Sequence, residues 1–137
     1  MQSLTETKNL LFAHLRDMPS FYAVRKMTVN ELADRSFWDG IHNALTPCGV
    51  LVLKESSDEG RARQRRSVWG FVIIVQGNGE DVEDRLLALV EEVQVKLMHF
   101  FEGKPGLMLL PNSKLTMLET GSDYMAAEVE MITEDSD

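Results

Sequence analysis

One stretch, residues 67–101, constrains the fold more than any other part of the chain. Residues 67–76 are almost all apolar, β-branched or aromatic, which is typical of a strand covered on both faces. Gly77-Asn78-Gly79 then permits a sharp turn, because glycine adopts positive φ at little steric cost. Apolar residues recur from Val82 to Phe101 with a helical period, so we expect a long helix that packs back on the strand and forms the core.

The rest of the chain predicts shorter elements around this unit. Ser3 and Glu6 form a capping box for a helix over residues 3–18, which Pro19 ends. Ser36 is the expected N-cap of a short helix over residues 36–45, and a second capping box, Thr28 to Glu31, precedes it. We expect further strands over residues 21–27, 48–54, 107–110, 114–119 and 124–132.

These elements predict a single α+β domain over residues 1–137. Its sheet should be mixed and mostly antiparallel, flanked by the N-terminal helix, a short helix and the long helix. The strand at 124–132 alternates apolar and polar residues, so we expect it at or near a sheet edge. Residues 55–66 are expected to form a long basic loop, and residues 133–137 a frayed acidic tail.

Composition narrows the class of protein. The net charge of −8 argues against the whole surface acting as a nucleic-acid binder. The sequence contains no run of about 18 apolar residues that would span a bilayer, and its start has no secretory pattern. One cysteine excludes an internal disulfide and fits a reducing cytoplasm.

The charges are unevenly distributed along the chain. Arg61, Arg63, Arg65 and Arg66 occur together, whereas residues 119–137 hold seven acids and neither lysine nor arginine. A chain with one basic segment and one acidic segment can be complementary to copies of itself. The alternative is that both segments are solvated surface that keeps the protein soluble.

Catalytic chemistry has little support in the sequence. His14, His42 and His99 fall in three different expected helices, and none has a second ligand at metal-binding spacing. Cys48 begins an apolar strand, where cysteine usually acts as a small buried residue, although a cysteine-based site stays open as an alternative. The Gly-Asn-Gly turn lacks a P-loop motif and precedes four acids that would repel phosphate. We expect no catalytic, cofactor or metal site.

A possible contact face lies on the long helix instead. At about 100° per residue, Leu87 and Met98 lie to one side of the buried stripe and Val95 points away from it. Apolar residues on the outer side of a helix suggest contact with a further surface.

The order of elements resembles the tail-terminator (tail-completion) proteins of long-tailed bacteriophages. The resemblance covers essentially the whole chain and rests on the apolar segments 44–52 and 69–75, the helix segment 86–93 and the strand at 121–131, with the polar segment between the first two. It rests on pattern and length and includes no diagnostic motif.

The resemblance implies a structural virion protein, made in the host cytoplasm, that forms a six-membered ring on the tail tube. Such a ring ends tube polymerisation and joins the tail to the head-side connector. It implies contacts with copies of the same chain, with the tube protein and with the connector, and no catalytic residues. The four arginines would then lie at a subunit interface or line the lumen, where they would meet genomic DNA without base specificity. The alternatives are another head–tail connector or tail-assembly protein and, from a different class, a small cytoplasmic enzyme that uses Cys48.

Overall fold

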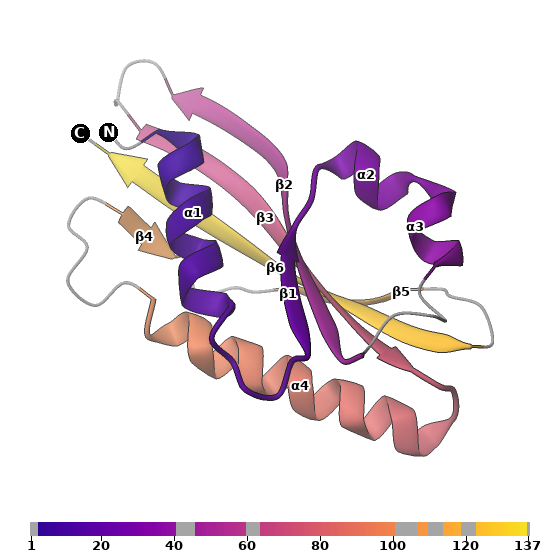
Figure 1. Ribbon diagram of the computed structural model, residues 1–137. Helices are drawn as coiled ribbons and strands as arrows, with labels where there is room; N and C mark the ends of the chain where they lie inside the picture. Colours follow the sequence, from indigo (N-terminus) through magenta and orange to yellow (C-terminus); the bar gives the residue numbers. More distant parts are fainter. Residues whose placement is uncertain are drawn as a thin grey trace.

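The computed structural model describes residues 3–40, 46–59, 64–100, 107–109, 114–118 and 123–136. They form a six-stranded sheet with helices on both faces, which confirms the predicted α+β class (Figure 1). The elements in chain order are α1 (Leu4–Leu15), β1 (Ala23–Lys26), α2 (Val29–Ala33), α3 (Arg35–Asp39), β2 (Cys48–Glu59), β3 (Gln64–Gln76), α4 (Glu80–Met98), β4 (Leu107–Leu109), β5 (Lys114–Leu118) and β6 (Tyr124–Ser136).

The sheet is mixed and mostly antiparallel, as expected. Its order is β1-β2-β3-β6-β4, and β5 also pairs with β6. The β1–β2 pair is parallel and every other pair is antiparallel. β1, β2 and β6 therefore run in one direction, while β3, β4 and β5 run in the other.

The predicted strand–turn–helix unit is the core of the structure. Alternate residues of β3 point to the sheet face that α1 and α4 cover, and Trp69, Phe71 and Ile73 are fully buried there. The apolar stripe of α4 packs on the same face, as predicted. Its buried residues are Leu86, Leu89, Val90, Val93 and Leu97. Gly77 and Gly79 both have φ of 104°, so the turn uses the conformational freedom that the sequence indicated.

The opposite face of the sheet carries a second, smaller apolar cluster under α2 and α3. Val72 and Ile74 of β3 point into this cluster, and Phe37 and Trp38 of α3 pack against it. The Trp38 indole donates a hydrogen bond of 2.7 Å to the Leu32 carbonyl oxygen, which ties α3 to α2. β3 is therefore covered on both faces over this half, which explains its continuous apolar sequence.

The short helices α2 and α3 each begin at a residue whose side chain accepts a hydrogen bond from a backbone N–H of the first turn. Thr28 and Glu31 form the complete capping box predicted for α2. The expectation that Ser36 caps the next helix is wrong, because Asp34 lies at the N-cap and accepts from the Ser36 N–H at 3.0 Å. The expected continuation of this helix over residues 41–45 lies outside the described residues.

Two expectations about polar segments are corrected. Residues 55–59 and 64–66 are not loop: β2 and β3 continue as a ladder from Glu55 opposite Val68 to Glu59 opposite Gln64. The segment expected to be a frayed tail is in β6 as far as Ser136 and pairs with β3. β6 lies near an edge of the sheet, as expected, because β3 lies on one side of it and the described edge strands β4 and β5 lie on the other.

Candidate assembly surfaces

The arginine segment is partly built into the sheet. Asp58, Arg65 and Asp135 occupy opposite positions on three neighbouring strands. An Arg65 guanidinium nitrogen lies 3.4 Å from Asp135 Oδ2, and their side chains are only 14% and 8% exposed. The acidic segment thus neutralises Arg65 within the same subunit, so Arg65 belongs to the sheet and not to the expected loop.

The other three arginines differ from Arg65. Arg66 is exposed and lies opposite Ser57 and Glu134 in the ladder. Arg61 and Arg63 lie outside the described residues. The interface and lumen hypotheses for these three arginines therefore stay predictions.

The outward residues of α4 lie where the helical period placed them. Val95 is 55% exposed and Met98 is 75% exposed, while Leu87 is partly exposed. None of the three belongs to the buried apolar clusters of the described residues. Their role as a contact face remains a prediction.

Among the described helices, α1 contacts one flank of α4 and none contacts the other. On the covered flank, Glu92 accepts a hydrogen bond of 2.7 Å from the Ser20 hydroxyl, and the His14 imidazole bonds the Lys96 carbonyl oxygen. The opposite flank carries residues spaced alternately three and four apart, which therefore form one stripe along the helix. They are Asp84, Leu87, Glu91, Gln94 and Met98.

β5 extends the sheet beyond this second flank. Leu115 and Met117 lie opposite Val129 and Ala127, whose side chains face α4, so both point to the α4 side of the sheet. They are 39% and 42% exposed, and no described element lies over them. We call the α4 stripe together with Leu115 and Met117 the α4–β5 shelf. The alternation of Leu115 and Met117 was the available sequence signal, but only the pairing with β6 assigns them to this face.

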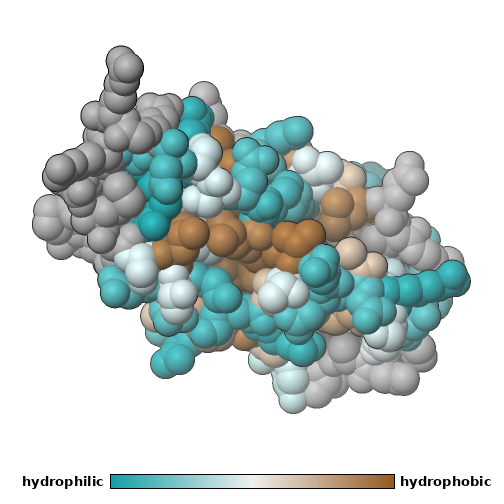
Figure 2. All heavy atoms as spheres, turned by 90° about the horizontal axis from the view of Figure 1, so that it is seen from above, coloured by the Kyte–Doolittle hydropathy of each residue, from teal (hydrophilic) through white to brown (hydrophobic). Residues whose placement is uncertain are grey.

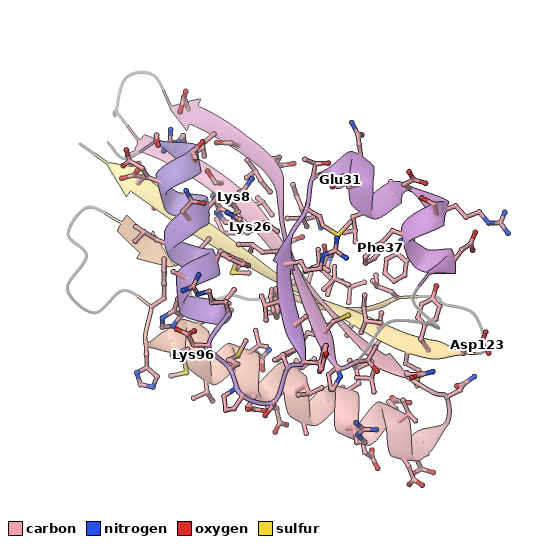
Figure 3. All side chains as sticks on the ribbon, viewed as in Figure 1. Lys8, Lys26, Glu31, Phe37, Lys96 and Asp123 are labelled. Atoms are coloured by element: carbon pink, nitrogen blue, oxygen red, sulfur yellow. The ribbon has the colours of Figure 1, made fainter. Side chains whose placement is uncertain are left out.

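The opposite edge of the sheet has a basic character. Lys26 of β1 donates a hydrogen bond of 3.1 Å to Asn9 Oδ1, and its ammonium lies 4.9 Å from the Phe12 ring centroid. Lys8 is one turn before Phe12 on the same flank of α1, and Figure 3 shows Lys8 and Lys26 between α1 and β1. We call this surface, made by Lys8, Phe12 and β1, the α1–β1 edge. Its outer backbone pairs with no described strand.

A cavity of about 240 Å³ lies next to this edge, between the start of α1, the start of α2 and β2. Its apolar walls come from Leu4, Met27, Val29 and Leu53, and Lys8 contributes the charged group.

Seen from above, apolar side chains gather in a band across the middle of the molecule, with hydrophilic side chains on both sides (Figure 2).

The sheet face opposite α4 carries a small ionic cluster. The Lys54 ammonium lies 3.1 Å from a Glu128 oxygen and 3.0 Å from a Glu130 oxygen. Burial lowers the pKa of Lys54, but hydrogen bonds to Glu130 and Glu128 outweigh this effect and raise the pKa overall. The carboxylates are therefore paired with a lysine that stays charged, which makes them poor candidates for acid–base chemistry.

Cys48 is buried and lies in the cluster under α2 and α3. Burial raises the pKa of the Cys48 thiol, although the charge of Arg25 opposes this effect. Because the thiolate is the reactive form, this environment disfavours a nucleophilic role.

Among the described side chains no three His, Cys, Asp or Glu residues gather as a metal site. His14 contacts Phe100 with ring centroids 5.3 Å apart, and His42 lies outside the described residues.

No family model matches the chain, and no curated protein matches it. In the part of the chain that the structure describes, no helix is both long and apolar enough to cross a membrane.

Proposed function

We propose that this chain is a structural phage protein that assembles as a ring on the head-proximal end of a tail tube. In this proposal the ring ends tube polymerisation and presents its other side to the head-side connector. The chain acts there without catalysis. The proposal starts from the resemblance of the element order to tail-terminator proteins.

The observation that carries the proposal is that the described sheet ends in two unlike edges. The α1–β1 edge is basic and lies beside a cavity, while the α4–β5 shelf combines exposed apolar residues with acids. Two different surfaces on one subunit favour head-to-tail contacts, which close into a ring when the rotation between neighbours allows. A ring of six is what the resemblance implies.

The arginines outside the core remain candidates for a second role. Arg61, Arg63 and Arg66 would meet either the tail tube or the phosphates of DNA in the lumen. Replacing all three by Ser spares the Arg65–Asp135 pair, so the fold should be retained. Overlong tubes would indicate the protein contact, whereas normal tails with altered DNA retention would indicate the DNA contact.

The proposal is tested by negative-stain microscopy of the purified protein mixed with polymerising tail tubes. We expect rings at one end of each tube and a narrower distribution of tube lengths. The matched control is the same preparation without this protein, which should give unrestricted lengths. Tubes that grow unchanged and carry no rings would contradict the proposed function.

A further inference from the structure

We infer that the α1–β1 edge of one copy docks on the α4–β5 shelf of the next copy, so that one sheet continues across the contact. This inference rests on the ring assembly proposed above and names the two surfaces that would form it. The occupant of the shelf is therefore a second copy of this chain.

Strand direction is compatible with such a junction. β1 is parallel to β2 and β6, whereas β5 is antiparallel to β6. Suppose that the next copy continues the sheet and that α1 and α4 lie on the same side of the sheet in both copies. The β1 strand of the next copy then runs antiparallel to β5 of the first. Antiparallel pairing is the slightly more stable arrangement, and both strands have an outer edge unpaired by the described residues.

The shelf is continuous because α4 and β6 start at the same end of the molecule. The Gly77 N–H donates a hydrogen bond of 2.8 Å to the Asp123 carbonyl oxygen and fixes this common start. With rises of about 1.5 Å per helical residue and about 3.3 Å per strand residue, Leu87 and Glu91 lie roughly level with Ala127 and Val129. The β5 partners of these two β6 residues, Met117 and Leu115, therefore lie at about the same level along the sheet as Leu87 and Glu91.

Charge and polarity also match across the proposed contact. In a continued sheet, α1 of the second copy would lie above β5 and beside the free flank of α4. Lys8 and Lys26 would then approach Asp84 and Glu91, while Phe12 would cover Leu87, which lies between these two acids along the helix. Lys8 forms no ion pair with a described carboxylate in the single subunit, so its charge is available for a neighbour.

The test reverses the charges on each of the two surfaces and measures the mass of the resulting assemblies. The first variant carries Lys8→Glu and Lys26→Glu, and the second carries Asp84→Lys and Glu91→Lys. Each should weaken self-association roughly tenfold or more, because two attractive pairs become repulsive. All four changes in one chain should restore assembly to within about threefold of the wild type, since the charges are again opposite. The measurement is light scattering after size exclusion, as a function of protein concentration, at low and high salt.

Matched controls carry the same charge changes elsewhere on exposed positions. They are Arg35→Glu with Arg85→Glu, and Asp39→Lys with Asp81→Lys. These controls should assemble as the wild type does, and circular dichroism should show every variant folded.

Four outcomes would overturn the inferred contact. They are a wild type that stays monomeric at all concentrations, a closed symmetric dimer, variants that assemble normally, and a fourfold variant that is not restored. The results separate the two proposals. If the charge-swapped variants still form rings and the rings cap tubes, the proposed function stands and the inferred contact is wrong. If the fourfold variant restores rings but the rings do not cap tubes, the inferred contact stands and the proposed function is wrong.

Discussion

The indole N–H of Trp69 donates a hydrogen bond of 2.9 Å to the hydroxyl oxygen of Thr133 in the interior of the protein. Trp69 is fully buried and Thr133 is 2% exposed. A buried tryptophan needs a partner for its only donor group, and here the partner comes from the distal half of β6. The largest side chain of the core therefore depends on a segment whose own sequence is polar.

This pair predicts the effect of Thr133→Val. The change keeps the shape of the side chain but leaves the buried indole N–H without its acceptor, which should cost about 1–3 kcal/mol of unfolding free energy. Chemical denaturation measures the loss. The control is Trp69→Phe combined with Thr133→Val, whose cost should be less than the sum of the two single changes. Strict additivity would show that the hydrogen bond contributes nothing.

Ile73→Asp should severely destabilise the fold. Ile73 is fully buried between β3 and the covering helices, and a carboxylate there would have no partner. The expected loss is about 3 kcal/mol or more, against about 0.5–1.5 kcal/mol for the control Ile73→Val. The measurement is the melting temperature of both variants. An unchanged melting temperature for Ile73→Asp would mean that the core is misassigned.

Two strand glycines should respond differently to alanine. A Cβ at Gly49 would overlap the ring of Phe71, which Phe21 holds in an edge-to-face contact with centroids 5.8 Å apart. Gly49→Ala should therefore cost about 1–3 kcal/mol. At Gly70 the nearest atoms belong to the flexible ends of Glu128 and Lys54, which can shift. Gly70→Ala should thus be milder in urea unfolding, and the reverse order would refute this account.

Arg65 and Arg66 are adjacent but should not be equivalent. Arg65→Ser removes the ion pair between this arginine and the largely buried Asp135 and should cost about 1–3 kcal/mol. Arg66→Ser changes an exposed side chain and should stay within about 0.5 kcal/mol of the wild type. Denaturation of the two single variants provides the comparison, in which equal effects would count against a structural role for the Arg65–Asp135 pair.

The buried thiol predicts a pH dependence of stability. Burial raises the pKa of Cys48 above the value of 9.0 assigned to a free thiol. The folded state then holds the proton more tightly than the unfolded state, so this contribution is complete below about pH 9 and is lost as the pH rises through the folded pKa. We expect the unfolding free energies of wild type and Cys48→Ala, measured from about pH 8 to about pH 10, to converge. Only the wild type loses the stability that the protonated Cys48 thiol contributes. A difference that is independent of pH would argue against the burial of the thiol.

Local pattern was sufficient for the parts of the fold that depend on neighbouring residues. The apolar run of β3, the two glycines and the stripe of α4 predicted the central unit because each feature lies within one segment. The exposed positions of Val95 and Met98 followed from the same helical period. None of these inferences required knowledge of which strands pair.

The polar ladder could not be predicted in this way. Residues 55–59 and 64–66 have no apolar alternation. Residues 64–66 pair with Glu134, Asp135 and Ser136 of β6, which come from far along the chain, and residues 55–59 pair in turn with β3. The α4–β5 shelf was missed for the same reason, since Leu115 and Met117 acquire a defined face only through pairing with β6. Cross-strand partners distant in sequence leave little local trace.

The position of β6 has a consequence for the nascent chain. β6 comes last among the described strands but lies inside the sheet, between β3 and the pair β4 and β5. At roughly 5–20 residues per second, β3 waits several seconds on the ribosome before its neighbour is synthesised. During this interval its apolar side chains and its unpaired backbone edge are open to other chains. Molecular chaperones or low expression should therefore raise the yield of native protein, and translation products that stop before Asp123 should aggregate.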